Sequence, residues 1–198
     1  MVPDEGYNPK VFEMGCMRFP PTSITLFHYL NKFGLKPIGA FPDPGKVKTS
    51  LMYQNEVIDW PAGSKTPDNA DFQRIGEDFG SIVVYLLGNA QTPDRDNPTK
   101  LFDYWALYQD NPSSNTKAGV VGAWQALIDA YKDVTYYKAV FDLAQNTDLV
   151  QHPWTGEDMN KFGALGVGSG GFGPLFGVNF LDIIRLFANG LEDNQEFL

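Results

Sequence analysis

The chain has 198 residues, of which 43% are hydrophobic and 14% aromatic, and its formal net charge at pH 7 is -9. This composition provides for one substantial core, or a core with a small lobe, and excludes a disordered chain. The negative charge and the scattered positions of its Lys and Arg residues argue against nucleic acid as a partner.

Local composition excludes several further classes of protein. The longest uninterrupted apolar run, residues 82–87, is far shorter than the roughly 20 residues that span a bilayer, so no membrane partner is expected. Residues 1–7 lack the basic and apolar regions of a secretory signal, which predicts a cytoplasmic location. Cys16 is the only cysteine, which excludes an internal disulfide and a cysteine-based zinc site.

The N-terminal part is predicted to contain a strand and then a helix. Residues 7–15 are typical of a short strand, and the double proline at 20–21 ends the extended stretch that follows. Thr or Ser at 22–23 can cap a helix that Gly34 ends. The apolar residues of this helix recur at helical spacing: Leu26, Leu30 and Phe33. This order places Arg18 on the loop between the strand and the helix.

The middle of the chain is predicted to contain a hairpin followed by helices. Two short stretches, 47–53 and 57–60, flank Gln54-Asn55-Glu56, a pattern typical of a small hairpin. From about residue 70 the apolar residues recur at helical spacing in four stretches: 72–87, 99–108, 118–131 and 134–143. Residues 146–165 are predicted to form a loop, and residues 180–191 a last helix.

A glycine-rich stretch, residues 166–173, contains the spacing G-x-G-x-x-G of a dinucleotide-binding turn at Gly166, Gly168 and Gly171. Such a turn needs a buried strand directly before it and a helix directly after it. Residues 161–165 make a poor strand, and Pro174 stands where the helix should continue. A glycine loop that lets backbone pass close to a ligand or another element is therefore favoured. A self-sufficient nucleotide-binding protein is the alternative, and it requires a strand leading into Gly166.

These elements predict an α+β chain that is mostly helical, with a small strand and hairpin region near the N-terminus. We expect three parts. Residues 1–66 hold the strand, loop, helix and hairpin; residues 67–165 are helical; and residues 166–198 hold the glycine-rich stretch and the last helix.

Arg18 is the candidate binding residue, because it lies among apolar and small neighbours just before the double proline. Its guanidinium could bind a substrate carboxylate with two parallel hydrogen bonds, or pair with a structural carboxylate such as that of Glu13. His28 and His152 have no companion histidine at metal-ligand spacing, so no metal site is predicted. The sequence also offers no set of nucleophile, base and orienting residue, so no catalytic side chain is predicted.

Several blocks of sequence resemble one protein family in the same order along the chain. Residues 12–30 contain Glu-Met-Gly-Cys-Met-Arg-Phe-Pro, which resembles the segment Glu-x-Gly-x-Met-Arg-Phe-Pro of flavin-dependent tryptophan 2-monooxygenases and related L-amino-acid oxidases. Four further blocks are similar to the same family: residues 41–45, 53–63, 166–173 and 180–190. The resemblance implies a two-domain flavoprotein with the amine-oxidase fold and FAD as its cofactor.

The resemblance also implies roles for particular residues. Arg18 would bind the carboxylate of the amino-acid substrate, and the backbone around Gly15, Met17 and Arg18 would lie against the flavin ring. The glycine-rich stretch would approach the active site, which makes Phe172 a candidate substrate-binding residue. The implied reaction moves a hydride from the substrate Cα to the flavin, and the reduced flavin then reacts with O2.

The resemblance covers only part of such an enzyme. Family members have a dinucleotide-binding glycine loop before the first block and a further FAD-binding segment after the last one. We therefore expect an internal fragment, or one chain of a complex, that binds FAD weakly or not at all and is inactive alone. Its partners would be an L-amino acid, with an aromatic one favoured, O2 and the missing FAD-binding segments. The alternative is a non-catalytic binding module that retains only the substrate lobe.

Overall fold

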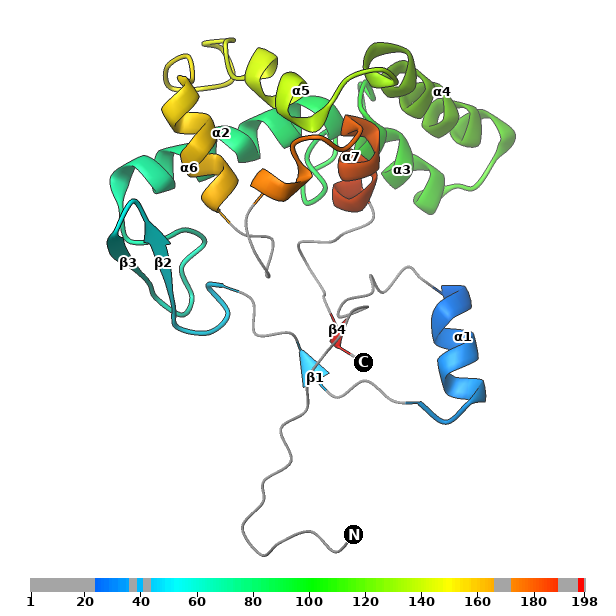
Figure 1. Ribbon diagram of the computed structural model, residues 1–198. Helices are drawn as coiled ribbons and strands as arrows, with labels where there is room; N and C mark the ends of the chain where they lie inside the picture. Colours follow the sequence, from blue (N-terminus) through cyan, green and yellow to red (C-terminus); the bar gives the residue numbers. More distant parts are fainter. Residues whose placement is uncertain (1–23, 36–38, 41–43, 166–171, 189–195, 198) are drawn as a thin grey trace, which may run out of the picture. The chain divides into compact units, whose positions relative to one another are not determined.

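The computed structural model describes residues 24–35, 39–40, 44–165, 172–188 and 196–197 (Figure 1). The chain forms two compact units, one made of residues 1–41 with 189–198 and the other of residues 42–188. The strand predicted over residues 7–15 lies outside the described residues. Within the described residues the fold class is α+β and mostly helical, as predicted.

The first unit contains the predicted N-terminal helix. Helix α1 (Ile24–Lys32) has no fully buried side chain. Gly34 follows it with a φ of 72°, a left-handed conformation that glycine adopts without steric cost, and the Leu35 N–H donates to the Leu30 carbonyl at 2.9 Å. The predicted end of the helix is thereby confirmed. The same unit holds two short antiparallel strands, β1 (Gly39–Ala40) and β4 (Glu196–Phe197).

The second unit begins with the predicted hairpin, formed by β2 (Thr49–Tyr53) and β3 (Glu56–Trp60). Gln54 and Asn55 connect the strands with φ angles of 47° and 69°. Two residues with positive φ make a turn whose twist matches that of paired strands, and Asn tolerates this conformation well. The connection is thus one residue shorter than the predicted 54–56, because Glu56 pairs with Tyr53 and begins β3.

Helices make up most of the second unit. They are α2 (Ala70–Leu87), α3 (Leu101–Asp110), α4 (Ser114–Tyr131), α5 (Tyr136–Leu143), α6 (Gly156–Ala164) and α7 (Phe180–Ala188), with a 3₁₀ turn at Gly173–Leu175. The helices predicted over residues 72–87, 99–108, 118–131 and 134–143 are confirmed, and each predicted end lies within four residues of the observed one. None of the helices that the structure describes is both long enough and apolar enough to cross a bilayer.

The core of the second unit is built around α2. Its buried apolar side chains follow the helical period: Phe72, Ile75, Phe79, Ile82, Leu86 and Leu87. Helices α3 and α6 pack against α2, α4 packs against α3, and α7 packs against α4 and α5. Figure 1 shows the hairpin at one end of this unit and the α3–α4 pair at the other, with α2 between them. Each fully buried apolar side chain contributes about 1.5–3 kcal/mol, so this stripe decides which face of α2 points inward.

The loop predicted over residues 146–165 is wrong in its second half, which forms α6. Thr155 caps this helix, because its hydroxyl accepts a hydrogen bond from the Asp158 N–H at 3.2 Å. The Asp158 carboxylate in turn accepts one from the Thr155 N–H at 2.8 Å, which completes a capping box. Glycine at positions 156 and 163 and the few apolar residues between them hid the helical pattern.

The backbone on either side of the glycine-rich stretch excludes a dinucleotide-binding turn there. Helix α6 and Leu165 precede Gly166, where such a turn needs a strand. The residues that follow form the 3₁₀ turn at Gly173–Leu175, where such a turn needs an α-helix. The alternative of a self-sufficient nucleotide-binding protein is therefore excluded for this stretch.

Candidate functional site

Described residues hold the two ends of the glycine-rich stretch together. The Phe172 N–H donates to the Leu165 carbonyl at 2.9 Å. Leu165 is the C-cap residue of α6, and both residues are buried. The 3₁₀ turn begins at the next residue, Gly173, and packs against α6. The base of the stretch is thus part of the helical core of the second unit.

Phe172 lies in a cluster of aromatic rings. Its ring is stacked on that of Phe162, with centroids 4.6 Å apart and planes 13° apart. The rings of Phe79 and Tyr136 lie 5.6 and 6.0 Å away. Only 8% of the Phe172 surface is exposed in this chain. Such aromatic pairs contribute roughly 0.5–1.5 kcal/mol each beyond the area that they bury, so the cluster holds Phe172 firmly.

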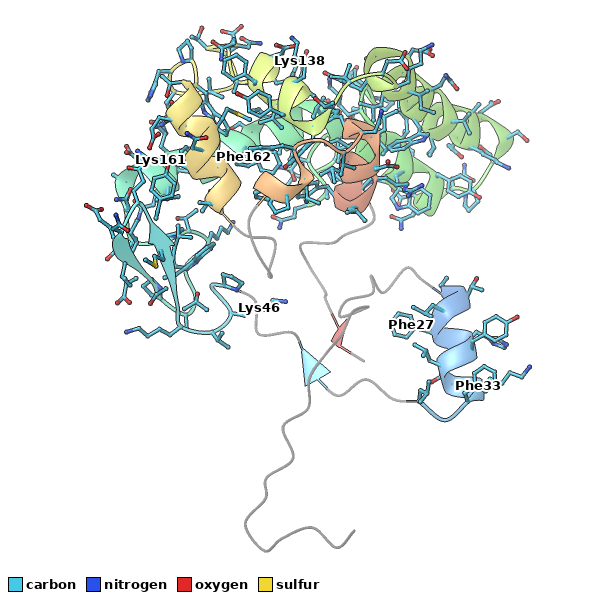
Figure 2. All side chains as sticks on the ribbon, viewed as in Figure 1. Phe27, Phe33, Lys46, Lys138, Lys161 and Phe162 are labelled. Atoms are coloured by element: carbon cyan, nitrogen blue, oxygen red, sulfur yellow. The ribbon has the colours of Figure 1, made fainter. Side chains whose placement is uncertain are left out.

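Phe162 connects this cluster to α6 and α2. Figure 2 shows Phe162 and Lys161 on opposite sides of α6, with Lys161 towards the hairpin. The Phe162 ring packs against Phe79 of α2, with centroids 4.7 Å apart, and against Trp154, 5.4 Å away. The side of α6 that carries Phe162 therefore faces the core, and any shift of α6 moves the ring on which Phe172 is stacked.

A buried ionic network lies one turn from Phe162, between α2 and α6. Arg74 donates from Nη1 to Asp78 Oδ2 at 3.2 Å and from Nη2 to the carboxylate of Asp158. The side chains of Arg74, Asp78 and Asp158 are 11%, 3% and 9% exposed. Two carboxylates and one guanidinium leave one excess negative charge, which needs further hydrogen-bond donors in a buried place.

Neutral donors around the two carboxylates meet this need. Asp78 accepts from the Trp154 indole N–H at 2.8 Å and from the Gln151 backbone N–H at 3.0 Å. Asp158 accepts from the backbone N–H and the hydroxyl of Thr155 at 2.8 and 2.7 Å. The network therefore ties α2, α6 and the segment 151–155 into one structure.

The pKa of Asp158 reflects these contacts. Burial opposes the ionised form of Asp158, but hydrogen bonds from Thr155 and the hydrogen bond and charge of Arg74 outweigh burial and hold the pKa below its usual value. The contribution of this carboxylate to stability is therefore present above the ordinary pKa of Asp and is lost as the pH falls through the lower, folded-state pKa. Near neutral pH the ion pair with Arg74 is fully formed.

A shallow polar pocket of about 210 Å³ lies between the hairpin and the first turns of α2 and α6. Its wall contains Tyr53, whose hydroxyl donates to Glu157 at 2.8 Å, and Gln54, whose amide donates to the same carboxylate at 3.0 Å. Lys161 on α6 forms an ion pair with Asp71 of α2 across the pocket. These polar groups are engaged with one another and fasten the hairpin to the helices.

The predicted site residues Gly15, Met17 and Arg18 lie outside the described residues, so their roles stay predictions. Phe172 is described, and the structure places it at the base of the glycine-rich stretch. No group of three or more His, Cys, Asp or Glu side chains among the described residues is placed to hold a metal ion.

Sequence reasoning missed the network of Arg74, Asp78 and Asp158. The spacing of Arg74 and Asp78 is that of an ion pair on one helix face, which is a detectable signal. Their partner lies on α6, in a segment whose apolar pattern predicts a loop. Only the packing of α6 against α2 brings Asp158 to Arg74.

Comparison with known proteins places these features in a family. The pattern of the flavin-containing amine oxidoreductases matches residues 2–175. The chain is 36% identical over 198 aligned residues to tryptophan 2-monooxygenase of Pseudomonas savastanoi, covering 95% of this chain and 32% of that protein. It is 34% identical to tryptophan 2-monooxygenase of Pantoea agglomerans pv. gypsophilae, covering 98% of this chain and 34% of that protein.

A relative with another named substrate is also similar. Phenylalanine 2-monooxygenase precursor of a Pseudomonas species is 23% identical, covering 92% of this chain and 28% of that protein. The chain therefore spans about a third of the length of the curated relatives described here.

Proposed function

The chain belongs to the family of flavin-containing amine oxidoreductases, and from this membership we propose that it is the substrate-recognition portion of an FAD-dependent L-amino-acid oxidase or monooxygenase. The observation that carries the proposal is the similarity along more than nine-tenths of the chain to enzymes named for tryptophan and phenylalanine. Both names point to an amino acid with an aromatic side chain as the substrate class, and O2 is the second substrate.

Arg18 is the residue to which we assign the substrate carboxylate. A guanidinium can bind both carboxylate oxygens with parallel, charge-assisted hydrogen bonds, which fixes the direction in which the substrate Cα points. The chemistry that FAD supplies when bound is acceptance of a hydride from that Cα. The protein's contribution in this proposal is orientation, which can lower a barrier by several kcal/mol.

The proposed contacts to the cofactor fall on Gly15, Met17 and the backbone of Arg18. The glycine-rich stretch is not assigned to the FAD phosphates, because the described backbone before and after it has neither the strand nor the α-helix that a phosphate-binding turn needs. Phe172 is assigned to the wall of the substrate site. With most of its ring covered by other aromatic side chains, it would present only its remaining exposed surface to a substrate.

Binding of L-tryptophan and of tryptamine to the purified chain, with FAD present, tests the role of Arg18. Tryptamine has the same ring and amine but lacks the carboxylate. We expect Arg18→Gln to weaken L-tryptophan binding by about thirtyfold, the factor for roughly 2 kcal/mol lost with a buried charge pair, and to leave tryptamine binding unchanged. Arg95→Gln is the matched control, because Arg95 is half exposed and pairs with Asp110 at the surface.

Titration calorimetry measures the affinities, and flavin absorbance after anaerobic addition of L-amino acids measures reduction. An equal loss of affinity for L-tryptophan and for tryptamine in Arg18→Gln would contradict the assignment of the carboxylate to Arg18. Bleaching of the flavin by an L-amino acid would show a working oxidoreductase and would contradict the expectation that this chain is inactive alone. Amino-acid binding without bleaching is the result expected of a substrate-recognition portion.

A further inference from the structure

The inner face of α6 carries a polar contact and an aromatic contact one turn apart. Asp158 and Phe162 are four residues apart and so lie on the same side of the helix. Asp158 forms the ion pair with Arg74 of α2, and Phe162 packs against Phe79 of the same helix. The Arg74 contact therefore sets the position of α6 along α2, and the ring of Phe162 follows from it.

Phe172 depends on α6 through two contacts of different kinds. Its ring is stacked on Phe162, and its backbone N–H donates to the carbonyl of Leu165 at the end of the same helix. A displacement of α6 would change both contacts together. We propose that Arg74 is a positioning residue that sets the place of Phe172 through Asp158 and α6.

The proposal rests on the proposed function only in the assignment of Phe172 to the substrate site. It would make Arg74, which is remote in sequence from the predicted site residues, a determinant of the shape of that site. The structural part, from Arg74 to Phe172, stands on contacts within the second unit alone.

The two contacts of residue 74 suit the planar guanidinium group of an arginine, whose nitrogens can donate in two directions. One nitrogen reaches Asp78 on its own helix, and another reaches Asp158 on α6. A lysine keeps the charge, but its single nitrogen lacks the two separated nitrogens of the planar fork, so we expect it to hold one of the two contacts rather than both. Asp78 is four residues away on the same helix, a spacing that a lysine at 74 can reach, so the contact to α6 is the one that a lysine is expected to lose.

A network that only stabilised the fold would act on the whole unit. Its loss would raise amide exchange equally throughout the core, because exchange there would follow global unfolding. A positioning role predicts a local effect on the amides of Leu165 and Phe172. The amides of Ile82 on α2 and Leu127 on α4 serve as references, since both residues are buried and lie on other helices.

The experiment measures amide hydrogen exchange by NMR on the 15N-labelled full chain, for the wild type, Arg74→Lys and Asp158→Asn. Asparagine at 158 keeps an oxygen that accepts hydrogen bonds from Thr155. Its amide NH2 would then face the N–H donors of Arg74, and two donors form no hydrogen bond. We expect exchange at Phe172 to rise about tenfold in both variants, the factor that corresponds to ~1.4 kcal/mol, with the reference amides changed less than about twofold. Arg95→Gln should change none of these rates.

Unchanged exchange at Phe172 in both variants would overturn the proposal, and so would an equal rise at all four amides. If Arg74→Lys fails to fold, Asp158→Asn decides alone by the same criteria. A wild-type chain that binds no amino acid in the presence of FAD would defeat the proposed function. The exchange result would still decide whether Arg74 positions Phe172, so the two failures are distinguishable.

Discussion

Two glycines on one face of α4 should respond in opposite ways to the same substitution. A Cβ atom on Gly119 would lie 2.3 Å from Cδ1 and 2.8 Å from Cε1 of Tyr104 on α3. A Cβ atom on Gly122, one turn later, would meet nothing within 4 Å. Gly119 thus allows α3 and α4 to approach closely, whereas Gly122 has no such packing role.

The expected magnitudes follow from this difference. Alanine in a helix interior is favoured over glycine by about 1 kcal/mol, so Gly122→Ala should raise the free energy of unfolding by up to that amount. Gly119→Ala gains the same propensity but overpacks the contact with Tyr104, which costs about 1–3 kcal/mol. The close atoms belong to the inner part of the ring, so the whole side chain must move. Gly119→Ala should therefore be about 1–3 kcal/mol less stable than Gly122→Ala.

Urea denaturation followed by far-UV circular dichroism measures the free energy of unfolding of both variants. The two can be compared directly, because each replaces glycine by alanine within the same helix. Thermal melts should show the same order, with about 2–4 °C for each kcal/mol in a chain of this size. Equal stability of the two variants would refute the close approach of α3 and α4 at Gly119, and with it this part of the packing.

Two further predictions concern polar contacts. Trp154→Phe removes the indole donor to the buried Asp78 carboxylate and should lower the free energy of unfolding by about 2–3 kcal/mol in the same urea assay. The control Trp105→Phe, at a site 45% exposed, should change this free energy by less than about 0.5 kcal/mol. Burial, with the hydrogen bond and charge of Glu157, raises the pKa of Tyr53 from 10.0 to about 12. The stability linked to Tyr53 should be complete below about pH 10 and lost as the pH rises through about 12, and Tyr53→Phe should remove this dependence in pH-dependent urea melts. A Tyr53 that ionises near pH 10 in an ultraviolet titration would contradict its contact with Glu157.

The elements of this fold were predictable where their signals are local. The polar run Gln54-Asn55-Glu56 between two short stretches predicted the hairpin, and Gly34 predicted the end of α1. Helix α6 was missed because its glycines and polar residues obscured the helical period, although Thr155 and Asp158 have the spacing of a capping box. A local signal was present there, but the apolar pattern by itself did not indicate it.

In the candidate site, too, local motifs predicted some features and only the packing of the chain revealed others. The resemblance of short motifs to a known family pointed to Arg18 and Phe172 without any knowledge of their surroundings. The packing of Phe172 on Phe162, and the dependence of both on α6, could not be predicted from those motifs. Aromatic residues are common in cores, and the sequence does not say which rings meet.

The sequence by itself determined the class of fold, most of its helices, the hairpin and the family to which the chain belongs. These depend on backbone preferences and side-chain periods within a few consecutive residues. Only the tertiary structure decided that Arg74 meets Asp158, a residue 84 positions away along the chain. Such a pairing depends on which helix faces come together, and that is set by the burial of the whole apolar core rather than by any local pattern.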